Sequence, residues 1–206
     1  MRGRYYLALG DSYTIGEGVG AEERWPVRLR AALEALGIAL NEPRILARTG
    51  WTTAELQAAI AAASPPPRAN HDLVTLLIGV NDQYRGYGAA TFRLGFEALL
   101  ARAIELADKD PHRVVVVSIP DWSVTPFARS DPRGREAIAA EIDAFNAIAR
   151  RRTTASGAAF VDVTEDSRRA AEDRTLLAAD SLHPSASMYA SWVELIEPAV
   201  RHALGA

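Results

Sequence analysis

The chain has 206 residues, of which 49% are hydrophobic and 24% charged, and its formal net charge is −3. This length supports one large hydrophobic core, and the composition is that of an ordinary globular protein. Cysteine is absent, which excludes disulfides, thiolate nucleophiles and cysteine-ligated metal sites, and the small net charge without a block of like charges gives no reason to expect a nucleic-acid partner.

No apolar run approaches the roughly 20 residues of a membrane span. The apolar run near the N-terminus is too short for a signal-peptide core, and no cleavage site of small residues follows it. We therefore expect a single domain (1–206) without an integral membrane segment, located in the cytoplasm. The sequence carries no signal for the oligomeric state.

Five short runs rich in Val, Ile and Leu predict buried strands. Most are continuous rather than alternating in hydrophobicity, which is typical of parallel strands covered on both faces. The runs are YYLALG (5–10), PRILAR (43–48), DLVTLLIG (72–79), RVVVVSIP (113–120) and AAFVDV (158–163). Because amphipathic segments separate them, they predict an α/β protein with a parallel sheet and helices on both faces.

The segment RWPVRLRAALEALG (24–37) predicts a helix between the first two strands. Pro26 suits a first helical turn, and Gly37 can end the helix in a left-handed conformation. The apolar side chains expected on its buried face are Trp25, Leu29, Leu33 and Leu36.

Two further helices are predicted later in the chain. Asp131 and Pro132 are expected to open one that ends near Gly157, and Ser185 is expected to precede the last helix. Within that last helix, Pro198 should cause a kink or an end. The buried faces carry Ile138, Ile142 and Phe145 in the first helix and Met188, Trp192 and Ile196 in the second.

Ligands of open α/β sheets bind beyond the carboxyl ends of the strands, which directs attention to Ser12 in GDSYT. A phosphate-binding loop is disfavoured there, because Gly16, Gly18 and Gly20 come late after the strand and no lysine accompanies them. Ser12 is then either an ordinary helix cap or a nucleophile beside helix N–H groups that favour negative charge. The second role requires partners.

A serine hydroxyl becomes a good nucleophile only when a base, usually histidine, takes its proton. His71 and His112 precede strands and so belong at the opposite edge of the sheet, and His202 lies in the last turns of the chain. His183 is the remaining candidate. Asp180, three residues earlier, can fix the tautomer of His183 or can simply cap a turn.

Acyl transfer also needs hydrogen-bond donors for the oxyanion of the tetrahedral intermediate. The backbone N–H groups of Ser12 and Gly50 and the side-chain amide of Asn81 can supply them, since each follows a predicted strand. Taken singly, Gly50 and Asn81 are ordinary turn residues. Together with Ser12 and His183 at one edge of one sheet, they predict a hydrolytic site.

Four segments of the chain resemble the four sequence blocks of the SGNH hydrolases, also called the GDSL esterase/lipase family. They are GDSY (10–13), the glycine of RTGWT (48–52), GVND (79–82) and DSLHP (180–184), in the order of the family. The resemblance implies a three-layer α/β/α, flavodoxin-like fold with five parallel strands. It implies Ser12, His183 and Asp180 as catalytic residues, and Ser12, Gly50 and Asn81 as the oxyanion hole.

Two positions depart from related patterns. Tyr13 stands where the first block of the family usually has leucine, which changes the packing around the nucleophile. The G-x-S-x-G elbow of the α/β-hydrolases is absent, because Thr14 stands in place of its second glycine. This argues against the larger α/β-hydrolase fold.

The resemblance implies a serine esterase that acts on small-molecule carboxylic esters without a metal or an organic cofactor. Short-to-medium acyl esters or lysophospholipids are expected, because the resemblance is closest to lysophospholipase-like members. A carbohydrate O-acetylesterase would use the same residues, and a non-catalytic ligand-binding module of the same fold is the alternative from another class. The aromatic residues expected to contact substrate are Trp51, Tyr84, Tyr87, Trp122 and Phe127.

Overall fold

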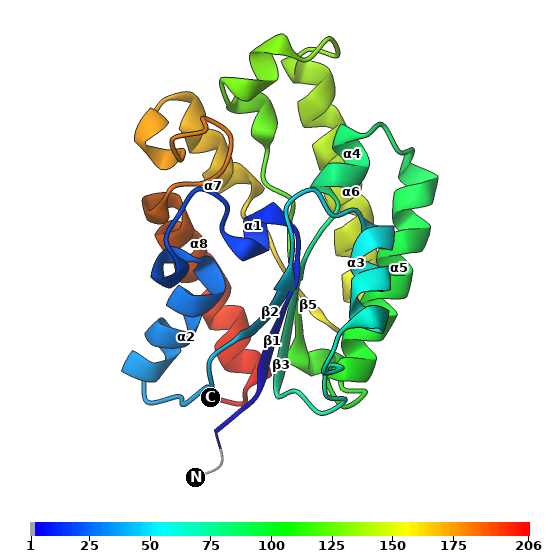
Figure 1. Cartoon of the computed structure of the whole chain (residues 1–206), viewed down its shortest axis with the longest axis vertical. Coiled ribbons are helices and arrows are strands. Elements are labelled where there is room, and N and C mark those ends of the chain that lie inside the picture. Colours follow the sequence, from blue (N-terminus) through cyan, green and yellow to red (C-terminus); the bar gives the residue numbers. More distant parts are fainter. Residues whose placement is uncertain (1–2) are drawn as a thin grey trace.

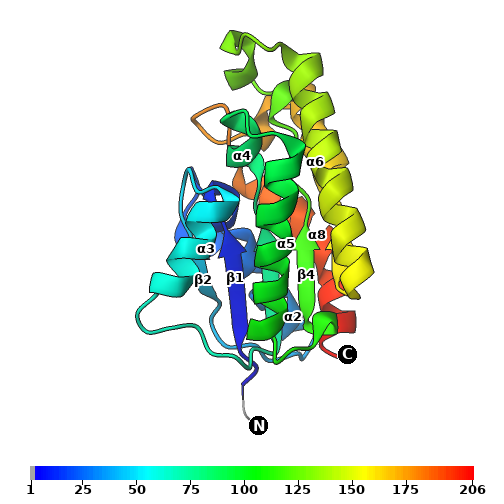
Figure 2. The same ribbon diagram turned by 90° about the vertical axis from the view of Figure 1, so that its right-hand side faces the viewer.

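The computed structural model describes residues 3–206, and it places five parallel strands in one sheet with helices on both faces (Figures 1 and 2). The strands are β1 (Tyr6–Gly10), β2 (Arg44–Ala47), β3 (Leu73–Leu77), β4 (Val114–Val117) and β5 (Ala159–Val161). Their spatial order is β2-β1-β3-β4-β5, and every neighbouring pair is parallel. The predicted fold class is confirmed, and this strand order is that of flavodoxin-like sheets.

The helices form a layer on each side of the sheet. Figure 1 shows α2 (Trp25–Ala35) and α8 (Ala186–Ala203) on one face and α3 (Thr53–Ala62), α5 (Ala89–Leu106) and α6 (Arg135–Ser156) on the other. The short helices are α1 (Ser12–Ile15), α4 (Val80–Tyr84) and α7 (Thr164–Arg168). Single 3₁₀ turns occupy Ala21–Glu23, Pro111–Arg113, Trp122–Val124, Phe127–Ser130, Arg169–Ala171 and Arg174–Leu176. No helix within residues 3–206 is long and apolar enough to cross a bilayer.

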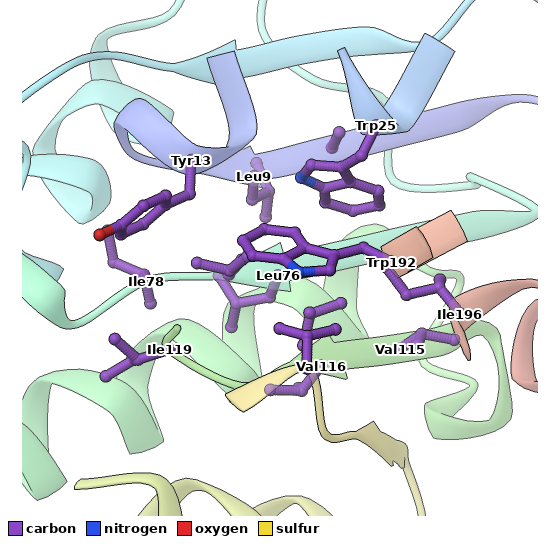
Figure 3. Close-up of a cluster of buried hydrophobic side chains, with 14 of the residues drawn as sticks. Leu9, Tyr13, Trp25, Leu76, Ile78, Val115, Val116, Ile119, Trp192 and Ile196 are labelled. Carbon is purple, nitrogen blue, oxygen red and sulfur yellow. The ribbon is translucent and has the colours of Figure 1, made fainter. Parts of the chain in front are cut away.

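The core on the α2/α8 side is built around two tryptophans. Trp25 and Trp192, both completely buried, lie over Leu9 of β1 and Leu76 of β3 (Figure 3). Every residue of β1, β3 and β4 is buried, as the continuous apolar runs predict. Burying each large apolar side chain contributes roughly 1.5–3 kcal/mol, so this packing supports the central strands whose ends carry the pocket.

The helix between β1 and β2 ends one residue earlier than its apolar pattern suggests. Leu33 is completely buried, but Leu36 is 55% exposed, so the prediction that Leu36 lies on the buried face is wrong. The reason is that α2 ends at Ala35, and Leu36 occupies the position after the last helical residue. Gly37 follows with φ +78° and turns the chain away, as expected.

The later helices also differ in part from expectation. Asp131 and Pro132 do not open α6, which begins at Arg135. Instead, the Asp131 carboxylate pairs with the Arg133 guanidinium at 2.8 Å within the preceding turn. Ser185 caps α8 as predicted, whereas Pro198 lies inside that helix and does not end it. The apolar face of α8 is buried on both sides of Pro198, and this packing offsets the hydrogen bond that proline removes.

Candidate active site

The helices α1 and α4 begin at the carboxyl edge of the sheet (Figure 1). A pocket of about 150 Å³ lies at this edge. In the sheet, β2 lies on one side of β1 and β3 lies on the other, so the direction in which successive strands are added reverses at β1. A crevice forms at such a point. The segments that follow β1, β2 and β3 meet at this crevice. The residues lining the pocket are Ser12, Tyr13, Thr49, Gly50, Val80, Asn81, Tyr84, Trp122, Phe127, Leu182 and His183.

The turn between β1 and α1 presents Ser12 to the pocket. A Cβ on Gly10 would lie 2.4 Å from the carbonyl oxygen of Leu77, so only glycine lets β1 end this close to β3. The Asp11 carboxylate caps α1 by accepting a hydrogen bond of 3.0 Å from the Tyr13 N–H. Ser12 is the first residue of the helix, and its own N–H donates to no partner within the described part of the chain.

Asp180 holds both the ring and the loop of His183. Its Oδ2 lies 2.6 Å from Nδ1 of the imidazole, and its Oδ1 accepts hydrogen bonds of 2.9 Å from the N–H groups of Leu182 and His183. Burial raises the pKa of the Asp180 carboxyl, but the hydrogen bonds from His183 and Leu182 outweigh it and lower the pKa below its ordinary value. The group is therefore a carboxylate at neutral pH.

Ser12 and His183 line the same pocket, although no hydrogen bond joins their side chains among residues 3–206. The Nδ1 of the imidazole is used by Asp180, so Nε2 is the nitrogen left for a proton transfer. Contacts between a nucleophile and its base are commonly longer without substrate than in the reacting complex. The geometry thus permits the pairing that the sequence predicts.

Two further donors lie beside Ser12. Gly50 has φ +86°, a conformation that favours glycine, and its N–H is not used by any hydrogen bond in the described chain. Its carbonyl accepts a 2.6 Å bond from the guanidinium of Arg85, which fixes the peptide. The amide of Asn81 donates one hydrogen to the carbonyl of Trp51 at 2.9 Å, and its second hydrogen has no partner among residues 3–206.

Replacing Asn81 by alanine is expected to reduce kcat for ester hydrolysis about 10²- to 10³-fold with little change in KM, because an oxyanion donor acts mainly in the transition state. Steady-state kinetics on a nitrophenyl ester would measure both constants. Thr49→Ala, at another position on the pocket wall, is the matched control and should reduce kcat far less. Equal activities of Asn81→Ala and the parent would contradict the role.

A buried carboxylate connects the segments that carry Gly50 and Asn81. Asp82 accepts hydrogen bonds from the N–H and the hydroxyl of Thr53, at 2.9 and 2.6 Å, and so ties the start of α3 to α4. Sequence reasoning did not assign Asp82 a role, although it follows Asn81 directly in the GVND block. Its contribution is to keep the two donors at a constant separation.

Three of the five predicted aromatic residues line the pocket. Tyr84, Trp122 and Phe127 form one wall, with ring centroids 5.6–6.1 Å apart. Trp51 and Tyr87 are not among the residues that line it. Sequence reasoning did not place Thr49, Val80 or Leu182 in the pocket, and the available signal was that each directly precedes a predicted site residue.

Asp11 is completely buried next to the nucleophile. One carboxylate oxygen accepts the Tyr13 N–H, while Oδ2 has no hydrogen-bond partner in the described structure. Burial, and secondarily the charge of Asp82, raises the pKa of Asp11 to about 8. The folded protein therefore keeps a proton on Asp11 that the unfolded chain, with a pKa near 3.9, releases.

Because only the folded state keeps this proton, the free energy of unfolding falls as the pH rises from about 4 to about 8, by up to about 1.4 kcal/mol per pH unit. Above about pH 8, Asp11 causes no further decrease. Asp11→Asn retains the acceptor for Tyr13 but cannot ionise. Urea unfolding at pH 5 and pH 8 should show the variant gaining free energy of unfolding relative to the parent at the higher pH. A difference that is the same at both pH values would contradict the buried, protonated state.

The sequence matches the model of the GDSL-like lipase/acylhydrolase family over residues 8–190. No curated protein sequence matches the chain. Similar solved structures include a lipase/acylhydrolase from Enterococcus faecalis (22% identity, TM-score 0.70, 98% of this chain and 96% of that chain).

Two further solved structures share the fold. An extracellular lipase from Streptomyces rimosus has 23% identity and a TM-score of 0.64, and the match covers 97% of this chain and 99% of that chain. An acetylxylan esterase from Geobacillus stearothermophilus has 18% identity and a TM-score of 0.67, and the match covers 99% and 95%. At these identities, the structural likeness concerns the fold.

Proposed function

The chain belongs to the GDSL-like lipase/acylhydrolase family and is a carboxylic ester hydrolase, and from this premise we propose that it hydrolyses short-to-medium acyl esters or lysophospholipids through an acyl-enzyme on Ser12. One observation carries the proposal. Ser12 and His183 line one pocket, Asp180 binds Nδ1 of the His183 ring, and the Ser12 and Gly50 N–H groups are unused within residues 3–206.

In the acylation step, the Ser12 hydroxyl attacks the ester carbonyl while His183 takes its proton at Nε2. The negative oxygen of the tetrahedral intermediate receives hydrogen bonds from the N–H groups of Ser12 and Gly50 and from the Asn81 amide. The Asp180 carboxylate stabilises the imidazolium that forms. Collapse of the intermediate breaks the bond to the alcohol oxygen, which takes the proton from His183 and leaves as the free alcohol.

In the deacylation step, water attacks the acyl-Ser12 ester and gives one proton to His183. The same donors stabilise the second oxyanion. When this intermediate collapses, the proton returns to the Ser12 oxygen, and the carboxylic acid is released. The cycle restores the hydroxyl and the neutral imidazole, so atoms and protons balance without a cofactor in the reaction.

The wall of Tyr84, Trp122 and Phe127 supports an apolar acyl group as the part of the substrate that enters the pocket. A cavity of about 150 Å³ is large enough to hold a group of the size of benzene. The rings of Tyr84 and Phe127 are 48% and 41% exposed at the surface, where they could also stack on a sugar. This exposure supports a carbohydrate O-acetylesterase as the second candidate.

A fluorophosphonate probe tests the catalytic part of the proposal. Stoichiometric labelling of the intact protein, mapped to the peptide that contains Ser12 and prevented by a nitrophenyl butyrate pulse, is the expected result. A protein that is not labelled would instead be a ligand-binding module of the same fold. Comparing nitrophenyl esters, lysophospholipids and acetylated xylo-oligosaccharides on unlabelled enzyme then selects the substrate class.

A further inference from the structure

Tyr13, which replaces the usual leucine of the first block, borders two cavities. It lines the pocket at Ser12 and also a second cavity of about 10 Å³. Trp122 and Leu182 are the other side chains common to both. The second cavity is further lined by Pro120, Asp121, Thr125, Ser167, Leu177, Pro184 and Met188.

The polar side chains of the second cavity are already engaged. Asp121 accepts hydrogen bonds of 2.9 Å from the Ser123 N–H and from the Arg168 guanidinium. The hydroxyls of Thr125 and Ser167 donate to the carbonyls of Trp122 and Thr164. Because the side chains of Asp121, Thr125 and Ser167 are engaged with protein partners and the other lining residues besides Tyr13 are largely apolar, this cavity suits hydrocarbon.

The Tyr13 ring is held in place by its neighbours. Its centroid lies 5.6 Å from that of the His183 ring, edge to face, and 6.3 Å from that of Trp192. The side chain is only 3% exposed. In Figure 3 the ring lies at one end of the core cluster, and its hydroxyl points away from Trp192. A ring packed in this way is a constant boundary between the two cavities.

We propose that Tyr13 limits the length of the acyl chain that the enzyme accepts. This inference rests on the proposed function. In the parent, an acyl group can occupy the pocket of about 150 Å³ but cannot extend into the second cavity, because that cavity, at about 10 Å³, has room for about one water molecule. Removing the ring would join the two cavities and add the volume of the ring itself, which makes room for the end of a longer chain.

The test is kcat/KM for nitrophenyl esters with two to ten acyl carbons. For the parent, kcat/KM should decline beyond about six carbons, since a benzene-sized group fills a cavity of this volume. For Tyr13→Ala, the octanoate-to-butyrate ratio should rise about tenfold or more, because each additional buried methylene contributes about fourfold. Tyr13→Phe keeps the ring and should keep the chain-length profile of the parent. This variant therefore separates an effect of side-chain volume from an effect of the hydroxyl group.

Leu177→Ala provides a control, because Leu177 lines the second cavity and not the pocket at Ser12. Alone, it should leave the length profile unchanged. Combined with Tyr13→Ala, it should favour long chains further, a coupling that appears only if the two cavities have joined. If Tyr13→Ala does not fold, Tyr13→Leu, with the residue usual in the family, should raise the same ratio about fourfold.

An unchanged octanoate-to-butyrate ratio in a Tyr13→Ala or Tyr13→Leu variant that still reacts with the fluorophosphonate would overturn the inference about Tyr13 and leave the proposed function intact. A parent profile that already peaks at eight or more carbons would do the same. A parent that does not react with the probe would instead overturn the proposed function. The two failures are therefore distinguishable in one set of experiments.

Discussion

Replacing Ser12 by alanine is expected to lower kcat for ester hydrolysis by about 10⁶, and adding His183→Ala to that variant is expected to cost nothing further. The hydroxyl and the imidazole act as one unit, because the base has no proton to take once the nucleophile is gone. Any activity that survives reflects the oxyanion donors and substrate binding, which Ser12→Ala leaves in place.

The measurement is the kcat of the two single variants and the double variant on one nitrophenyl ester. The Ser12 side chain makes no hydrogen bond within residues 3–206, so Ser12→Ala should unfold at the same temperature as the parent. Ser185→Ala is the matched control, because that serine caps α8 and does not line the pocket. Effects of Ser12→Ala and His183→Ala that multiply in the double variant would show that the residues act independently.

Replacing Asp180 by asparagine is expected to lower kcat about 10⁴-fold at neutral pH while the fold is retained. The asparagine Oδ1 can still accept the two backbone hydrogen bonds that shape the loop, from Leu182 and His183. The atom in contact with Nδ1, however, becomes an uncharged N–H donor. The ring then takes the wrong tautomer, and the imidazolium of the transition state loses its neighbouring charge.

Comparing two variants separates the catalytic role of Asp180 from a structural one. Asp180→Ala removes the loop hydrogen bonds as well and should lower the melting temperature, whereas Asp180→Asn should not. Melting curves by circular dichroism, measured beside kcat, provide both quantities. If Asp180 merely caps a turn, Asp180→Asn would retain nearly the activity of the parent, and the orienting role would be abandoned.

Several features of this protein follow from sequence patterns that are local. A run such as VVVV in β4 favours a buried strand, and this preference depends only on residues adjacent in the chain. The same holds for Asp180 and His183, since three residues of turn are enough to bring carboxylate and imidazole together. Candidate groups at one edge of the sheet could therefore be named before their contacts were known.

Two expectations failed for local reasons. The helix α2 ends at Ala35, which leaves Leu36 exposed, and Asp131 pairs with Arg133 in the turn before α6 instead of opening that helix. Other features depend on segments far apart in the chain. Trp51 and Tyr87 are close in sequence to residues of the pocket, yet its aromatic wall consists of Tyr84, Trp122 and Phe127.

By itself, the sequence determined the strands and the parallel α/β class and named candidate residues for acyl transfer, because these depend on hydrophobic runs and on short motifs along the chain. Only the tertiary structure decided the strand order, the pocket wall and the position of Tyr13 between two cavities. The physical reason is that a cavity is bounded by side chains from distant segments, and their directions are determined by packing rather than by neighbours in sequence.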